Sequence, residues 1–154
     1  AQNLKLAYVD FTEVIQLMPE MDSARVQIDA ASAEAQETYQ AMVEEFQTKY
    51  QQFEQKQASW TPAIRESKAA ELQQIEGRIQ EFQQVAQQDL QKKENELMAP
   101  IYEKVKNTID EVAKAGGYTI ILPGSALIYI DAAQVKDIAS EVKSKLGITT
   151  PAAQ

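Results

Sequence analysis

The sequence contains neither cysteine nor histidine among its 154 residues. The missing cysteine excludes disulfide bonds and thiol chemistry, and the missing histidine removes the commonest general base and a frequent metal ligand. The chain also lacks a phosphate-binding loop of the form G-x-x-x-x-G-K-[ST] and a calcium loop of the EF-hand type. We therefore expect no enzymatic activity, no catalytic residue, no metal and no cofactor.

Basic residues are few compared with acidic ones, 15 against 23, which gives a net charge of −8. Because non-specific nucleic-acid binding depends on Lys and Arg, this balance argues against a nucleic-acid partner. No apolar run approaches the roughly 20 residues that cross a bilayer, so we expect no stable membrane insertion. The start Ala1-Gln2 is typical of a mature chain after signal-peptide removal, although a trimmed cytosolic protein would look the same.

The largest pattern in the sequence is a pair of apolar stripes with alternating 4-3 spacing, separated by Trp60-Thr61-Pro62. The first stripe is Tyr39, Val43, Phe46, Tyr50, Phe53 and Trp60, with the polar Gln57 at one position of the pattern, and the second is Leu72, Ile75, Ile79, Phe82 and Ala86. Apolar residues at heptad spacing pack against a partner helix. The sequence therefore predicts an antiparallel coiled-coil hairpin over residues 21–99, about 55 Å long at a rise of roughly 1.5 Å per residue.

The sequence on either side of this hairpin predicts a small body of mixed structure. The expected elements are a strand at Leu4–Val9, a helix from Phe11 capped by Asp10, a β-hairpin of Tyr118–Leu122 and Ala126–Ile130 around Pro123-Gly124-Ser125, and a helix that opens after Asp131 and closes at Gly147. The fold class is α+β. The body is discontinuous, made of residues 1–20 and 100–148, and residues 149–154 form a loose tail.

Two residues of the returning helix are candidate hinges. Gly77 lies mid-helix, where glycine costs about 1 kcal/mol relative to alanine. It marks a bending point, a close approach of the two helices, or simple tolerance at an exposed position. Pro100 interrupts an apolar pattern that continues beyond it, so we expect a kink there.

The tip of the predicted hairpin is a candidate contact surface. Between residues 49 and 68 there are four basic and two acidic residues, a local charge of +2 on an acidic chain. Trp60 lies where two paired helices cover each other least, so it is either a core residue or a contact residue. The candidate binding residues are Met42, Lys56, Trp60, Arg65 and Lys68.

The predicted body is too small for a large core, and its three strands leave open sheet edges. Self-association removes such edges when strands of several subunits close into one barrel. The candidate interface residues lie on the expected strands and are Leu6, Tyr8, Ile120, Leu122, Ile128 and Ile130.

In order and spacing, the motifs of this chain resemble the Skp/OmpH-like family of periplasmic chaperones. The resemblance spans nearly the whole chain. It is carried by Ala7-Tyr8-Val9-Asp10 with Glu13-Val14 and Met18-Pro19, Pro100-Ile101 with Val105, Gly117-Tyr118, Ile128-Tyr129, and Asp137-Ile138 with Val142 and Leu146.

This resemblance implies a periplasmic homotrimer with a shared β-barrel, whose helical arms hold unfolded outer-membrane proteins without ATP. The best-known members are basic, and some bind lipopolysaccharide; the net charge of −8 does not support that property here. Two other classes stay open. One is a structural coiled-coil scaffold or spacer, and the other is a prefoldin-like cytosolic chaperone, in which the chain typically begins with an arm helix.

Overall fold

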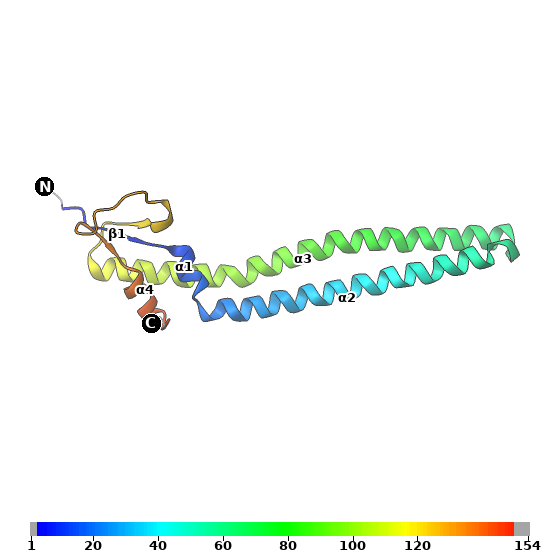
Figure 1. The fold of residues 1–154 in the computed structure, drawn as a ribbon, viewed down its shortest axis with the longest axis horizontal. Coiled ribbons are helices and arrows are strands. Elements are labelled where there is room, and N and C mark those ends of the chain that lie inside the picture. Colours follow the sequence, from blue (N-terminus) through cyan, green and yellow to red (C-terminus); the bar gives the residue numbers. More distant parts are fainter. Residues whose placement is uncertain (1–2, 150–154) are drawn as a thin grey trace. The chain divides into compact units, whose positions relative to one another are not determined.

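The computed structural model describes residues 3–149, and these divide into two compact units. The body unit comprises the described residues up to 25 and from 95 onward, and the hairpin unit comprises residues 26–94. Two long helices, α2 (Pro19–Lys56) and α3 (Pro62–Gly116), run through both units (Figure 1). The α+β class is confirmed, with helices dominating over a small three-stranded sheet.

The sheet of the body unit is parallel throughout. Strand β1 (Leu6–Val9) lies in the centre, between β2 (Ile120–Pro123) and β3 (Val135–Asp137). Leu6 pairs with Ile120 on one side and with Val135 on the other. Three strands were expected, but the antiparallel hairpin of Tyr118–Leu122 with Ala126–Ile130 is wrong, because the third strand forms later in the chain and pairs with β1.

The segment after β2 shows why no hairpin forms. It turns through a short 3₁₀ helix, η2 (Gly124–Ala126), in which Gly124 lies close to β1: an added Cβ would be 3.2 Å from the backbone nitrogen of Asp10. Ile128 and Tyr129 come next in irregular structure, 104% and 83% exposed. Their apolar, β-branched and aromatic composition indicated a strand, but this segment pairs with no strand of the described sheet, and the third strand is β3.

Asp131 caps a turn and does not open the last helix. Its side chain accepts a hydrogen bond from the Ala133 N–H at 3.0 Å, and its carbonyl accepts one from the Val135 N–H at 2.9 Å, immediately before β3. Helix α4 (Ala139–Lys145) begins later, where the Asp137 carboxylate accepts the Ala139 N–H at 2.9 Å. The predicted helix start is therefore too early in the sequence, because an Asp side chain that accepts a nearby backbone N–H forms a local turn as readily as it caps a helix.

The ends of the helices follow local sequence signals, and the predicted cap at Asp10 and the predicted helix end near Gly147 are confirmed. Asp10 caps α1 (Phe11–Gln16) by accepting the Glu13 N–H at 3.1 Å, and Pro19 is the first residue of α2. Gly117 ends α3 at φ 69°, and Gly147 lies just after α4 at φ 73°. These positive values favour glycine because a Cβ is strained there. Helix α3 continues through Pro100, so the proline does not end it.

The core lies in the body unit and draws on its helices and β1. Its buried members are Ala7, Val9, Val14, Ile15, Met18, Ala24, Ile101, Val105, Val112, Ile138 and Val142. In the hairpin unit, by contrast, Ile75 is the one buried hydrophobic residue among the described positions, at 3% exposure. The hairpin therefore owes little of its stability to a core.

The corrected position of the last strand can be tested with two isoleucines ten residues apart. Ile138→Ala removes a fully buried side chain, so we expect the body unit to lose about 2–5 kcal/mol of unfolding free energy. The matched change Ile128→Ala removes a side chain that is exposed in its own chain, so the loss in the monomer is expected to stay within about 0.5 kcal/mol. Native-state amide exchange of β1 measures both, at a dilution where both variants have the mass of a single chain. Equal losses of unfolding free energy in the two variants would contradict this position of the last strand and would favour the antiparallel hairpin instead.

Candidate functional site

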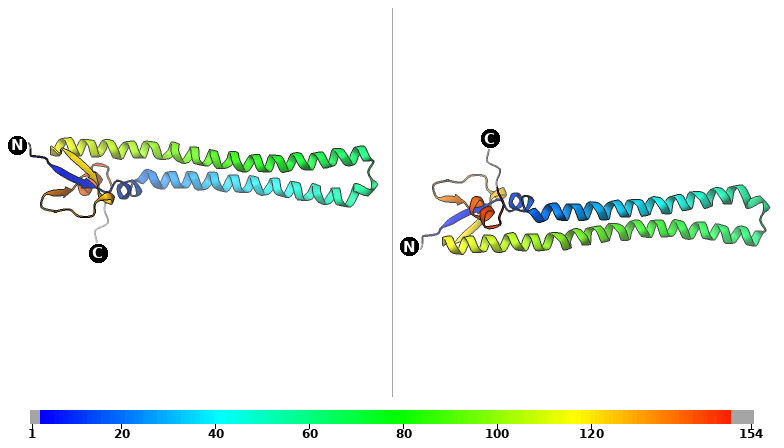
Figure 2. Two further views of the ribbon diagram at one scale, coloured as in Figure 1. Left: turned by 90° about the horizontal axis from the view of Figure 1, so that it is seen from above. Right: turned by 90° about the horizontal axis from the view of Figure 1, so that it is seen from below.

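The two helices of the hairpin unit are joined by a short, well-capped turn. Helix α2 passes into a single 3₁₀ turn, η1 (Gln57–Ser59), where the Ser59 hydroxyl donates to the Lys56 carbonyl at 2.8 Å. Pro62 is the first residue of α3, and the Thr61 hydroxyl accepts the Ile64 N–H at 3.4 Å. Figure 2 shows α2 and α3 running side by side up to this turn in both views.

Trp60 is both packed and accessible. Its ring meets Phe53 edge-on, with centroids 5.8 Å apart and planes at 61°. Both rings line a hollow of about 370 Å³ at the tip, here called the tip hollow. Its other lining residues are Lys49, Gln52, Lys56, Lys68, Glu71 and Leu72.

The tip hollow brings together three of the five candidate binding residues, Lys56, Trp60 and Lys68. Met42, which is half-buried, and Arg65, which is exposed, do not line it. Three lysines against one glutamate give the hollow a charge of +2, beside an aromatic and aliphatic floor. Such a surface suits an acidic or apolar segment of another chain.

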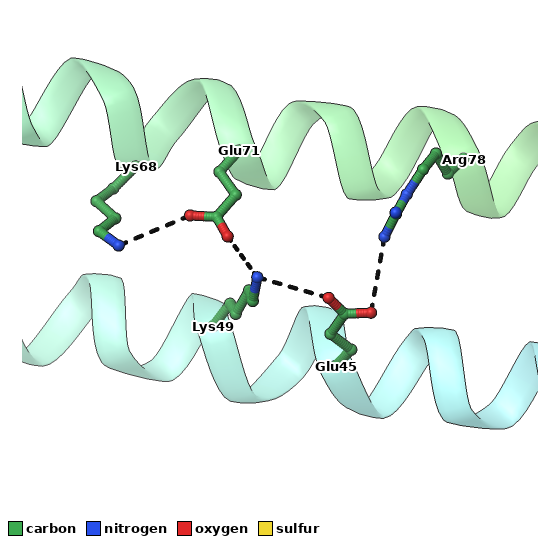
Figure 3. Close-up of polar contacts among 5 residues, drawn as sticks. All are labelled: Glu45, Lys49, Lys68, Glu71 and Arg78. Carbon is green, nitrogen blue, oxygen red and sulfur yellow. Dashed lines mark hydrogen bonds and ion pairs between the residues drawn. The ribbon is translucent and has the colours of Figure 1, made fainter.

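Two lining residues that the sequence did not single out, Lys49 and Glu71, hold the helices together (Figure 3). The Lys49 ammonium bonds to the Glu71 carboxylate across the two helices and lies 3.5 Å from Glu45 on its own helix. Glu71 also pairs with Lys68 at 3.7 Å, and Glu45 pairs with Arg78 at 3.7 Å. We call these five residues the ion staple.

The ion staple shifts the titration of its central pair. The hydrogen bond to Glu71 raises the pKa of Lys49, and the same bond lowers the pKa of Glu71. Each partner therefore stays charged across the neutral range, and the staple is fully formed there. The sequence contains a signal for the part of Lys49 in the ion staple. Lys49 is seven residues before Lys56, so both lysines have the same heptad position, which faces the other helix.

Most residues of the two apolar stripes are less exposed than their neighbours along the helices, but they are only partly covered. Tyr39, Phe46 and Phe53 are half-buried, and Tyr50 stacks on Phe46 with centroids 6.1 Å apart while remaining exposed. Gly77 is exposed, and an added Cβ would meet nothing within 4 Å. A close helix approach at Gly77 is therefore excluded, and the hinge role of Gly77 and Pro100 stays a prediction.

The candidate interface residues of the body unit fall into two groups. Ala7 and Val9 are buried in the core, so the alternating residues Leu6 and Tyr8 lie on the opposite face of the sheet. Their register partners Ile120 and Leu122 share that face. Ile128 and Ile130 lie outside the sheet, in the segment between η2 and β3.

Comparisons with known proteins agree with this architecture. The family model described as "Outer membrane protein (OmpH-like)" matches residues 5–146. The chaperone protein Skp of Yersinia enterocolitica is 23% identical over 141 residues, which cover 92% of this chain and 85% of that protein. The crystal structure of an OmpH-like protein from Caulobacter crescentus CB15 has the same fold, with a TM-score of 0.79 at 15% identity, covering 95% of this chain and 85% of that one.

The ion staple predicts how the hairpin responds to pH. Glu71 stabilises the fold because its pKa is lower in the folded chain than in the unfolded one. This stabilisation is fully present above the pKa of the unfolded chain, ordinarily 4.5, and it is lost as the pH falls through the lower pKa of the folded chain. Lys49 has the opposite dependence because its pKa is raised in the folded chain. Its stabilisation is present below 10.5, the ordinary value, and it is lost as the pH rises above that value. The protection of the amides in residues 45–80, measured as their exchange rate relative to the intrinsic rate at the same pH, is therefore expected to be highest between these limits and to fall in acid.

Glu71→Gln is expected to speed this exchange at pH 7 and to weaken its acid dependence, because the glutamine cannot pair as an anion with Lys49. Glu76→Gln is the matched control: Glu76 is exposed on the same helix and forms no ion pair with any residue from 3 to 149. Identical exchange profiles for the two variants would show that the staple does not stabilise the hairpin.

Proposed function

The chain belongs to the OmpH-like family, and we propose from this that it is an ATP-independent holdase for unfolded outer-membrane proteins in the periplasm. The family and its Skp relative support a chaperone of outer-membrane proteins. Within the described part of the chain, no helix is long and apolar enough to span a bilayer. A holdase needs no chemistry: binding the unfolded chain lowers its free concentration and so opposes aggregation.

The observation that carries the mechanism is the hairpin unit itself. Its two helices have almost no buried core, and they present partly exposed apolar side chains beside a basic, aromatic tip hollow. Such a surface offers many weak contacts to an unfolded chain. We propose that Lys56, Trp60 and Lys68 contact the client through the tip hollow, and that Met42 and Arg65 contribute from outside it.

We propose further that the protein is a homotrimer. The outer face of the sheet carries Leu6, Tyr8, Ile120 and Leu122, and β2 and β3 each pair on one side only within the described chain. Exposed apolar residues and open strand edges favour pairing with further copies. Ile128, fully exposed in the single chain, adds to this surface. Lipopolysaccharide is not proposed as a ligand because the chain carries a charge of −8.

Two other functions remain as outcomes of the tests. A structural scaffold would use the hairpin as a spacer and would protect no client. A prefoldin-like cytosolic chaperone would also hold clients on helical arms, and locating the protein in cell fractions separates it from a periplasmic one. The strand β1 and the helix α1 before the first long helix favour the OmpH-like arrangement.

The trimer is tested by native mass spectrometry. We expect a mass of about 52 kDa, three times the 17.2 kDa of one chain. Ile128→Asp is expected to dissociate the assembly, because an unpaired charge buried at an interface costs several kcal/mol. The substitution leaves the body core untouched, since Ile128 is fully exposed in its own chain. A wild-type protein that is only monomeric or dimeric at micromolar concentration would refute the trimer.

The role of the hairpin is tested by deleting residues 39–82 and rejoining the two helices. We expect a folded trimer that no longer suppresses light scattering by an unfolded outer-membrane β-barrel protein, whereas the intact trimer does so without nucleotide at about one trimer per client. Circular dichroism and native mass confirm that the shortened protein is folded. Equal protection by both proteins would place client binding on the body. No protection by either, with any client, would favour the scaffold.

A further inference from the structure

A second hollow lies further along the hairpin unit, away from the tip. It has a volume of about 280 Å³, and its floor is formed by small and apolar residues of both helices. These are Ala31, Ala35, Phe82, Val85, Ala86 and Leu90. Because α2 contributes alanines opposite the larger side chains of α3, the helices leave a gap, and Val85 remains 45% exposed. We call it the apolar hollow.

The apolar hollow and the tip hollow open on the same flank of the hairpin. In a two-stranded coiled coil, residues seven apart keep the same orientation toward the partner helix. On α2, Thr38 lines the apolar hollow, Glu45 belongs to the ion staple and Gln52 lines the tip hollow. The corresponding series on α3 is Val85, Arg78 and Glu71.

The spacing of the two hollows corresponds to a defined length of extended chain. Their centres on α2, near residues 34 and 52, are separated by about 18 residues, or roughly 27 Å at 1.5 Å per residue. An extended polypeptide covers that distance in about eight residues at roughly 3.3 Å each. The Glu45–Arg78 pair of the ion staple lines neither hollow, lies between them along both helices, and offers a hydrophilic surface to the backbone in that interval.

The chemistry of the two hollows differs. The tip hollow carries three lysines against one glutamate, and Lys56 forms no ion pair with any residue that the structure describes. Charge complementarity therefore selects an acidic side chain there. The apolar hollow has the size and lining for one large apolar side chain, and its rim residues Glu34 and Asp89 outnumber its single cation, Lys93.

We propose that this flank is a two-point binding site for an extended, unfolded segment of a client. A large apolar residue enters the apolar hollow, and an acidic residue about eight positions away pairs with Lys56 and Lys68 in the tip hollow. The inference rests on the proposed function and makes it more specific, since it assigns a side, a spacing and two residue types to the segment that the hairpin selects.

Trp60 is the single tryptophan of the chain, and it lines the tip hollow, so its fluorescence reports binding there directly. The probes are end-capped peptides without tryptophan, with one Phe and one Asp set four, eight or twelve residues apart in a Gly, Ser and Gln background. We expect the peptide with the spacing of eight to bind roughly tenfold more tightly than the one with four, which is too short to reach both hollows. It should also bind more tightly than the one with twelve, which reaches both hollows only with a slack loop that costs entropy.

Two pairs of matched variants separate the hollows from general surface effects. Val85→Glu, at the mouth of the apolar hollow, is expected to abolish the spacing preference, whereas Val26→Glu is not, because Val26 is 69% exposed outside the hollow. Lys56→Gln is expected to weaken the preferred peptide about threefold, whereas Arg25→Gln, which removes the same charge from an exposed position outside both hollows, is not. Circular dichroism checks that all four remain helical.

Equal affinities for the three spacings would overturn the two-point site, and so would equal effects of the two members of either pair. The scattering assay with an intact client distinguishes the two levels of failure. If the protein protects the client while the peptides show no preference, the two-point site is wrong and the holdase stands. If it protects no client, the proposed function itself fails.

Discussion

The constraint on which the rest of this molecule depends is the small amount of surface that two paired helices can bury. Each helix of the hairpin unit turns one stripe toward its partner, and most side chains of those stripes stay partly exposed. Ile75 is the single buried hydrophobic residue described there. Cohesion therefore depends on half-buried aromatic residues and on the ion staple, in which Lys49 and Glu71 bridge the helices (Figure 3). The same scarcity of burial keeps apolar and basic groups accessible for binding.

The body unit differs from the hairpin unit in its burial, because its short elements share one buried core. β1 has a neighbour on both sides, so its backbone is paired while Ala7 and Val9 point into the core. Met18, Val105, Ile138 and Val142, each at most 1% exposed, come from segments far apart in the sequence. Residues from both ends of the chain are therefore needed to complete the unit. The opposite face of the sheet stays uncovered in the single chain, which is why we attribute it to self-association.

Membership of the OmpH-like family and the accessible hairpin fit together physically. A protein that holds unfolded chains without chemistry needs neither a deep pocket nor perturbed catalytic groups. It needs long surfaces with moderate apolar character and enough charge to stay hydrated. The Gln- and Glu-rich helices are hydrophilic, and in the mechanism that we propose the two hollows supply local anchoring points without a continuous apolar surface. Weak, distributed contacts also let a client leave, because no single contact contributes much.

The sequence by itself determined the long helical hairpin, its turn at Trp60-Thr61-Pro62, the caps at Asp10, Gly117 and Gly147, and the family. These features depend on local signals: heptad spacing, proline at a helix start, and glycine where φ is positive. It also placed Lys56, Trp60 and Lys68 at one tip, because a turn between helices is a local event. Only the tertiary structure decided the path of the chain after β2. Segment 126–130 carries more strand-forming residues than segment 135–137, in which Val135 is the single one, yet the strand forms in the second segment. The choice fell to the segment that could pair with β1 in parallel while Ile138 and Val142 entered the core, and no local pattern encodes that competition.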